Sequence, residues 1–167
     1  MPIHQIMGRS RLRGVAWRVE PIRLENVDVE TFRSSPTLMG ILAQSVYQPT
    51  EERMHHILQR TYGQAGTTLF ALCAVDRCVA VAGTRRIGGG SAELLHIAVV
   101  PARRGEGFGR LLIDLLMQGQ GLRELVAETD ADAVGFYRSC GFSIASLGEK
   151  YPGAERVLCT RSTDGPR

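Results

Sequence analysis

The stretch from Glu93 to Leu116 constrains the fold most, because it combines a buried run, a glycine-rich turn and a helical period. The residues from Glu93 to Val100 are almost all apolar, which predicts a strand buried on both faces. Pro101 then ends the strand, since proline has no N–H to donate to a sheet. After the turn, apolar residues recur at helical spacing at Phe108, Leu111, Leu112, Leu115 and Leu116.

The turn between this strand and this helix has the composition of an anion site. The first N–H groups of a helix have no internal partner, and the helix dipole adds roughly half a positive charge there. Glycines at 105, 107 and 109 remove Cβ atoms that would keep a ligand away, and Arg103 and Arg104 add cationic side chains. The residues therefore predict a cradle for phosphate or pyrophosphate, unless the glycines only make a tight connection.

Two common nucleotide motifs do not fit this turn. A dinucleotide fingerprint has the spacing G-x-G-x-x-G, but counting from Gly105 and Gly107 puts Arg110 in the last position. A P-loop has Gly-Lys-Ser/Thr before its helix, and the only lysine of this chain is Lys150. Both motifs are therefore excluded.

The residues from Arg104 to Gly109 instead resemble the [Gln/Arg]-x-x-Gly-x-[Gly/Ala] motif of the GNAT superfamily of acyl-CoA N-acyltransferases. The preceding run from Leu95 to Pro101 looks like the fourth strand of that family. Downstream, the segment from Ala133 to Phe142 resembles the family's A-x-x-x-Y-x-x-x-G-F segment. The resemblance covers about Thr67 to Phe142, with both motifs in the family's order.

This resemblance implies a single α/β domain (α+β mixed), with a twisted mixed sheet of about six to seven strands and helices on both faces. Its central parallel strands would splay apart, and acetyl-CoA would enter the gap as co-substrate. The pantetheine arm would pair with the main chain of Ile97, Ala98 and Val99. The pyrophosphate would lie on the turn, at Arg103, Arg104, Gly105, Gly107, Phe108, Gly109 and Arg110.

Two candidate catalytic groups also follow from the resemblance. Tyr137 falls at the position of the family's catalytic tyrosine, and a phenol with a pKa of about 10 can protonate the leaving thiolate. Glu93 lies where some family members carry a base glutamate, and partial burial would raise its pKa. His96 is the alternative base, with a pKa that is ordinarily close to neutrality. Simple alternation puts Glu93 and His96 on opposite faces of the strand, unless a bulge intervenes.

Two other positions, Asp130 and Cys140, bear on how the cofactor would be held and on the route of transfer. Many relatives have asparagine where this chain has Asp130, so the cofactor contact of that amide is not carried over. Cys140 is a weak candidate for a covalent intermediate, because no neighbour in the sequence would activate its thiol.

The length of 167 residues fits one domain with a real core, which we expect at residues 21–161 between an N-terminal arm (1–20, expected to be mobile) and a tail (162–167). The net charge of +3 and the lack of a lysine-rich patch do not indicate nucleic-acid binding. No apolar run approaches twenty residues, so no membrane span is expected. Without a signal peptide or a zinc spacing, we expect no metal and a cytoplasmic protein with reduced cysteines at 73, 78, 140 and 159.

Local patterns predict the remaining elements. We expect strands near 21–25, 67–75, 78–86, 122–128, 142–146 and 155–160, with Asp76-Arg77 at the first hairpin turn. Helices should start at Ser34–Pro36, with a serine cap, and at Pro49–Thr50. A third should follow Thr129 or Asp130, either of which can cap it.

The sequence thus predicts an N-acetyltransferase that moves an acetyl group from acetyl-CoA to a primary amine by direct attack in a ternary complex. The amine would belong to a small molecule or peptide, and a homodimer is compatible with the sequence. A non-catalytic acyl-CoA sensor module is the alternative, and a scaffold without a CoA site is a third hypothesis.

Overall fold

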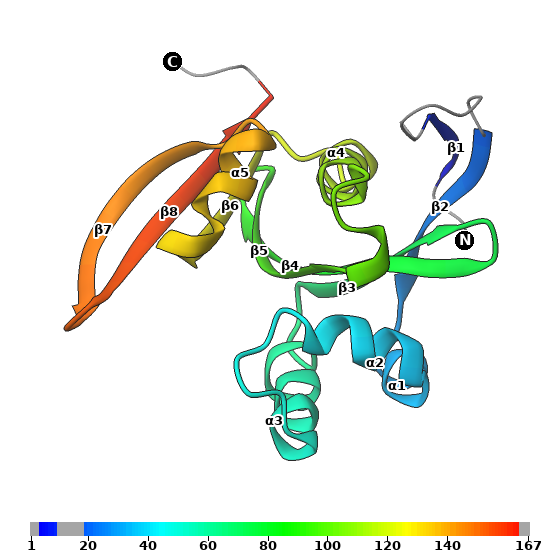
Figure 1. Ribbon diagram of the computed structural model, residues 1–167, viewed down its shortest axis with the longest axis horizontal. Coiled ribbons are helices and arrows are strands. Elements are labelled where there is room, and N and C mark those ends of the chain that lie inside the picture. Colours follow the sequence, from blue (N-terminus) through cyan, green and yellow to red (C-terminus); the bar gives the residue numbers. More distant parts are fainter. Residues whose placement is uncertain (1–3, 10–18, 164–167) are drawn as a thin grey trace.

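The computed structural model describes residues 4–9 and 19–163, and within them eight strands form one sheet in the order β1-β2-β3-β4-β5-β6-β8-β7 (Figure 1). The strands are β1 (His4–Arg9), β2 (Val19–Val27), β3 (Thr67–Ala74), β4 (Arg77–Gly88), β5 (Ser91–Val99), β6 (Glu124–Asp130), β7 (Ser143–Tyr151) and β8 (Ala154–Ser162). Strands β5 and β6 pair in parallel, and the other neighbours pair antiparallel.

Helices cover both faces of this sheet. The helices are α1 (Val29–Ser34), α2 (Pro36–Ala43), α3 (Glu51–His56), the π-helix η1 (Ile57–Thr61), the 3₁₀-helices η2 (Pro101–Arg103) and η3 (Ala131–Ala133), α4 (Phe108–Gly119) and α5 (Val134–Ser139). Helices α1, α2 and α3 lie on one side of the central strands, and α4 lies on the other (Figure 1). The predicted single α/β domain with a mixed sheet is confirmed.

All seven predicted strands are present, and β1 is an additional one. It pairs antiparallel with β2, from His4↔Leu24 to Arg9↔Val19. It falls inside the segment 1–20 that the sequence suggested as a mobile arm, whose residues 1–3 and 10–18 lie outside the described structure. The proposed boundaries of arm, domain and tail stay predictions.

The helix starts follow the capping residues. The hydroxyls of Ser35 and Thr50 accept hydrogen bonds from the third residues of α2 and α3, Leu38 N (3.3 Å) and Arg53 N (3.2 Å). Asp28 caps α1 in the same way, accepting from Thr31 N at 2.9 Å. Helix α1, in which Phe32 is the one buried residue, was not predicted.

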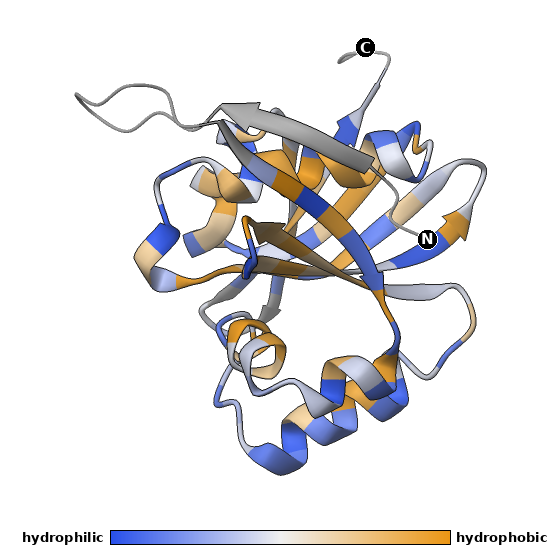
Figure 2. Cartoon of the chain, turned by 90° about the vertical axis from the view of Figure 1, so that its right-hand side faces the viewer, coloured by the Kyte–Doolittle hydropathy of each residue, from blue (hydrophilic) through white to orange (hydrophobic). Residues whose placement is uncertain are grey.

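Two hydrophobic clusters hold the layers together, one on each face of the sheet. The cluster under α4 and α5 includes Leu94, Leu112 and Tyr137. The cluster under α1, α2 and α3 includes Phe32, Leu58 and Tyr62. Hydrophobic residues gather where helices and sheet face one another, and hydrophilic residues line the outside of the lower helices (Figure 2). The alternating faces of β4 and β5 therefore separate two cores.

The parallel pairing of β5 and β6 is short. It consists of Ser91↔Glu124, Ala92↔Leu125 and Glu93↔Val126. Beyond Glu93, β5 stays paired with β4 on one edge, and β6 stays paired with β8. The two central strands therefore diverge, which leaves the free edge of β5 facing a gap.

A β-bulge in β5 changes which residues share a face. Gly83 of β4 pairs with His96 and Thr84 pairs with Leu94, so Leu95 is the extra residue. Leu94 consequently packs in the cluster under α4, while Leu95 packs in the opposite cluster and His96 contacts Tyr62 there. The simple alternation that put Glu93 and His96 on opposite faces is wrong, for the reason anticipated: the strand is bulged between them.

The first hairpin departs from two sequence expectations. Its turn residues are Val75 and Asp76, because Arg77 already begins β4. Cys73 and Cys78, which pair across the hairpin, are joined in a disulfide. The prediction of reduced thiols is therefore wrong for this pair, since it rested on the expected compartment and not on the facing positions. Cys140 and Cys159 are free and buried.

Among residues 4–9 and 19–163, no helix has the length and hydropathy of a membrane span. The same residues also contain no group of three or more histidine, cysteine, aspartate or glutamate side chains arranged to hold a metal ion.

The core under α4 gives a stability prediction. Leu112 is fully buried, so Leu112→Ala should lower the free energy of unfolding by about 2–5 kcal/mol through lost burial and a cavity. Leu147 on β7 is 54% exposed, so Leu147→Ala should change the free energy of unfolding by less than about 0.5 kcal/mol. Urea denaturation of both variants measures the difference, and equal losses would contradict the assignment of this core.

Candidate functional site

The divergence of β5 and β6 opens a pocket of about 1030 Å³. It reaches from the glycine-rich turn before α4, along the free edge of β5, to the loop after α2. Its lining comes from six parts of the chain: residues 44–47, residues 94–99 of β5, residues 103–110 except Glu106, residues 128–130 at the end of β6, Arg156 of β8, and Ala133, Phe136, Tyr137, Ser139 and Cys140 in and near α5. The volume is typical of sites for cofactor-sized ligands.

The start of α4 presents main-chain N–H groups to this pocket. Gly107 is its N-cap, and the first intrahelical bond runs from Leu111 N to Gly107 O at 3.0 Å. The amides of Phe108, Gly109 and Arg110 come before that bond, so the helix gives them no internal acceptor. Gly105 and Gly107 have φ angles of +79° and +91°, which side chains rarely adopt. A Cβ at either position would meet nothing within 4 Å, so these glycines serve the shape of the turn.

Gly109 has a different role from the other two glycines. A Cβ built on it would lie 2.8 Å from Cε2 of Phe136, which is closer than real side chains approach. Its missing side chain therefore lets α4 and α5 pack together beside the pocket. The expectation that all three glycines simply give a ligand access is corrected at this position.

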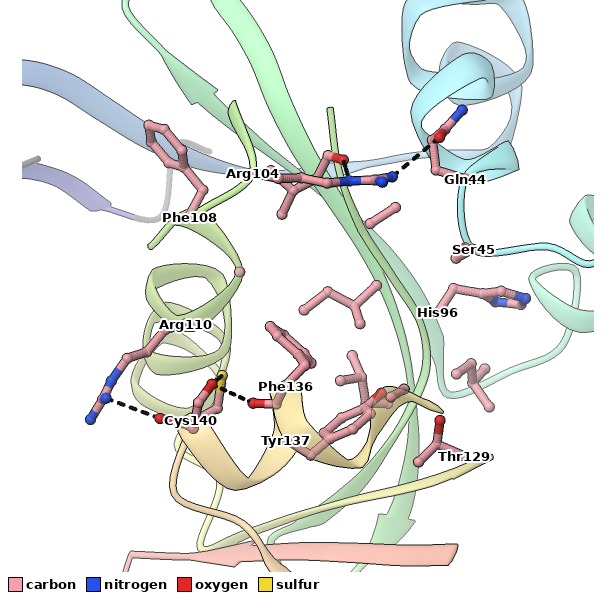
Figure 3. A pocket seen from close by; sticks show the side chains of 18 of the residues that line it. Gln44, Ser45, His96, Arg104, Phe108, Arg110, Thr129, Phe136, Tyr137 and Cys140 are labelled. Carbon is pink, nitrogen blue, oxygen red and sulfur yellow. Dashed lines mark hydrogen bonds between the residues drawn. The ribbon is translucent and has the colours of Figure 1, made fainter. Parts of the chain in front are cut away.

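The arginines around the turn bind protein groups. Arg103 forms an ion pair with Glu106 at 2.9 Å and lies over the ring of Phe108. Arg104 donates to the carbonyl of Val99 and to Oε1 of Gln44, both at 3.2 Å (Figure 3). These bonds tie the turn to β5 and to the end of α2, so the arginines shape the pocket as well as charging it.

The side chain of Arg110 points along the other direction, toward α5. Its guanidinium donates to the carbonyl of Ser139 at 3.1 Å (Figure 3). The N-terminus of α4 is therefore fixed to the C-terminus of α5.

Tyr137 lies in the same pocket. Its ring projects from α5 into the space beside β5 (Figure 3). It is 7% exposed and packs edge-on against Phe136 and Phe142, with both ring centroids 5.2 Å away. Burial, with smaller contributions from Cys159, Cys140 and Asp130, raises the pKa of Tyr137 to about 12. The phenol therefore stays protonated at neutral pH.

His96 lines the pocket from the face of β5 that carries α1, α2 and α3. Its Nδ1 lies 2.7 Å from the hydroxyl oxygen of Tyr62, which is buried behind it. Burial lowers the pKa of His96 below its ordinary value, so the imidazole is neutral at pH 7. A neutral imidazole on the pocket wall can accept a proton.

Glu93 lies apart from these groups. It is on the same face of β5 as His96, but it does not line the pocket. Its carboxylate accepts a hydrogen bond from Arg85 of β4 at 2.5 Å, and the two residues are direct partners in the sheet. The structure thus brings Tyr137 and His96 to one pocket and leaves Glu93 at its outer end.

Cys140 and Asp130 also line the pocket. Burial raises the pKa of the Cys140 thiol, which keeps it in the unreactive protonated form. Asp130 accepts from Ala133 N at 3.3 Å and caps the turn before α5, as predicted.

Some lining residues had no signal in their local sequence. Gln44, Ser45, Val46 and Tyr47 reach the pocket because α2 ends at Ala43 and the loop turns toward β5. Arg156 arrives from β8, which a pairing between distant segments brings beside Asp130. Such neighbours depend on sheet order and not on any motif.

Comparisons with known proteins identify the central part of the chain. The family model of the GNAT acetyltransferase domain matches residues 65–144. These residues include the turn before α4 and Tyr137, the two features that define the pocket. A search of curated protein sequences finds no match.

Solved structures share the fold at low sequence identity. An acetyltransferase from Thermus thermophilus is 20% identical with a TM-score of 0.67, covering 84% of this chain and 96% of its own. The ribosomal-protein-S18-alanine N-acetyltransferase of Escherichia coli is 21% identical with a TM-score of 0.62, covering 84% and 93%. A spermidine N-acetyltransferase from Vibrio cholerae is 15% identical with a TM-score of 0.64, covering 86% and 94%.

Two glycines in helices provide a test of how the pocket is built. Gly109→Ala should lower the free energy of unfolding by about 1–3 kcal/mol, because the new methyl group collides with Phe136. Gly135→Ala in α5 meets nothing within 4 Å and should raise it by about 0.5–1 kcal/mol through better helix propensity. Thermal or urea denaturation measures both, and two changes of the same sign would refute this packing.

Proposed function

Residues 65–144 form an acetyltransferase domain of the GNAT family, and on that premise we propose that the protein moves an acetyl group from acetyl-CoA to a primary amine. The acceptor is a small molecule or a peptide, and the amine attacks directly while both reactants are bound. One observation carries the proposal: the free edge of β5 and the N-terminal amides of α4 open into the same pocket as Tyr137.

The residues present fit acetyl-CoA. The amides of Gly105, Gly107, Phe108, Gly109 and Arg110 provide donors for a pyrophosphate at a helix N-terminus. Arg104 adds a positive charge beside the turn, because the oxygens to which its guanidinium donates are uncharged, whereas the charge of Arg103 is balanced by Glu106. The main chain of Ile97, Ala98 and Val99, on the edge of β5 that β6 leaves, can pair with the amides of a pantetheine arm. When bound, acetyl-CoA supplies an acetyl group on a thioester, whose leaving group is a thiolate.

Tyr137 is our candidate for the proton donor to that thiolate. Its phenol keeps its proton at neutral pH and faces the pocket from α5. The low polarity that raises the pKa of Tyr137 also raises the pKa of a nearby thiol, so the thiolate gains basicity as the phenol loses acidity and the two groups stay matched.

His96 is the better of the two candidate bases. An alkylamine with a pKa near ~10 is mostly protonated at pH 7 and must lose a proton before it can attack. His96 is neutral and on the pocket wall, whereas Glu93 is bound to Arg85 outside it. Glu93 can serve only if its ion pair with Arg85 opens.

The direct route is supported by the state of Cys140. A covalent route needs a thiolate, and burial keeps this thiol protonated.

The acceptor is expected to approach from the side of the loop after α2. Across the pocket, at the end of β6, the carboxylate of Asp130 favours a cationic group, while Glu128 binds Arg156. Proteins of this fold act on acceptors as different as spermidine and the alanine of ribosomal protein S18. A screen of polyamines, aminoglycosides, amino acids and peptide N-termini, with free thiol as the readout, tests the acceptor class.

Calorimetric titration with acetyl-CoA tests the cradle. The wild type should bind, and Gly107→Glu should weaken binding at least tenfold, because it adds a negative side chain beside the pyrophosphate amides and strains the positive φ. Equal binding by both proteins would refute the cradle. Binding without release of thiol to any acceptor would favour the sensor module.

Tyr137→Phe tests the proton donor. The variant keeps the ring and its packing, so binding of acetyl-CoA should be unchanged while kcat falls by about 10²-fold or more. Steady-state kinetics with the best acceptor measure both quantities. An unchanged kcat would remove Tyr137 from the proposed chemistry.

A further inference from the structure

Two irregular features of the backbone and one glycine meet behind His96. They are the π-helix η1, the bulge at Leu95 and Gly83. A π-helix and a bulge each interrupt regular hydrogen bonding, and π-helical turns are often found at functional sites. Neither η1 nor Gly83 lines the pocket.

The π-helix determines where Tyr62 lies. Tyr62 follows its last residue, and its N–H donates to the carbonyl of Ile57 at 3.3 Å. The hydroxyl of Thr67 lies 2.6 Å from the carbonyl of Gln64 and 3.2 Å from that of Tyr62, and its one proton is shared between them. The side chain of Tyr62 is 5% exposed, so its direction is fixed by its packing.

Gly83 provides the space through which the phenol reaches β5. A Cβ built on Gly83 would lie 1.7 Å from the hydroxyl oxygen of Tyr62 and 2.3 Å from its Cζ. No other residue type could occupy position 83 with Tyr62 in this place. Gly83 is also the direct partner of His96 in the sheet.

The bulge at Leu95 completes the arrangement by bringing His96 to the face of β5 on which Tyr62 lies. The result is the hydrogen bond of 2.7 Å between the Tyr62 hydroxyl and Nδ1, with ring centroids 5.8 Å apart. Tyr62 is not among the residues that line the pocket, so it can reach the reaction only through His96.

We propose that Tyr62 is a positioning residue, which holds Nδ1 of His96 so that Nε2 is the nitrogen offered to the amine and stabilises the imidazolium that forms. The role of Tyr62 in catalysis rests on the proposed function, whereas the contact between Tyr62 and His96 is observed in the structure. Gly83 and the bulge are the structural conditions for the contact.

The proton transfer can be followed atom by atom. An N–H bond of the ammonium breaks, its electron pair stays on nitrogen, and the Nε2 lone pair takes the proton. Nδ1 must then carry a proton as well, and the Tyr62 oxygen accepts the Nδ1–H hydrogen bond. A hydrogen bond from a charged donor is roughly twice as strong as a neutral one, so the phenol favours the protonated imidazole.

Charged groups surround His96 on both sides of the pocket. On the same face of β5, Arg85 and Glu93 form an ion pair, and across the gap Glu128 pairs with Arg156 while Asp130 caps the turn before α5. Burial also raises the pKa of Tyr62 well above its ordinary range, so the phenol does not ionise at working pH.

The experiment measures the pKa of His96 by NMR with ¹⁵N-labelled histidine. The chain has four histidines, so His96→Gln assigns the signal. Tyr62→Phe removes the acceptor of the Nδ1–H bond and should lower the pKa of His96 further, which moves the acidic limb of kcat/KM to lower pH. Gly83→Ala keeps the phenol but displaces it, and should shift the pKa in the same direction. An unchanged or raised pKa in Tyr62→Phe would overturn the proposal.

Kinetics separate positioning from a general structural effect. Tyr62→Phe should lower kcat/KM by about 10-fold to 100-fold, while acetyl-CoA binding stays unchanged. The loss should not exceed that expected for removing the general base itself. In a His96→Gln background the same substitution should have no further effect. Independent losses in the double variant would refute action through His96. The NMR shift needs no turnover, so a shift without acetyl transfer would reject the proposed function alone.

Discussion

The structure depends on the early end of the parallel pairing between β5 and β6. After three residue pairs, each strand keeps its antiparallel neighbour and the two halves of the sheet separate. The separation costs the hydrogen bonds that a longer parallel ladder would have formed. It produces a pocket whose wall is the free edge of a strand, with Tyr137 on one side and His96 on the other. The position of the site is therefore determined by the geometry of the sheet, and the side chains determine its chemistry.

Glycine has two distinct roles around this pocket. Gly105 and Gly107 allow backbone angles that the turn requires, and they have open space around them. Gly109 and Gly83 do not need unusual angles, but each leaves room for a ring, of Phe136 and Tyr62 respectively. The turn therefore depends on the backbone freedom of glycine, whereas the walls beside it depend on the absence of a side chain at Gly109 and Gly83.

The sequence predicted the features that depend on neighbours along the chain. The turn and the period of α4 follow from residues a few positions apart, as do the helix starts near Ser35, Thr50 and Asp130. Features that depend on pairing between distant segments were missed, such as the Tyr62 contact and the disulfide of Cys73 and Cys78. The bulge at Leu95 was foreseen only as an exception, because the run from Leu94 to Val100 has no polar residue except His96 to mark a change of face. Of the site residues, Tyr137 could be named because it falls inside a motif, whereas nothing around Tyr62 distinguishes it from any core tyrosine.

Because of the bulge, β5 contributes different residues to the pocket from each face of the sheet. On one side of the sheet, Ile97 and Val99 pack toward α4 and the turn; on the other, Leu95 and His96 face the loop after α2. The gap is therefore lined from both sides of the sheet. Under the proposed function, acetyl-CoA and the amine reach the gap from opposite sides, so that one can be bound while the other arrives or departs.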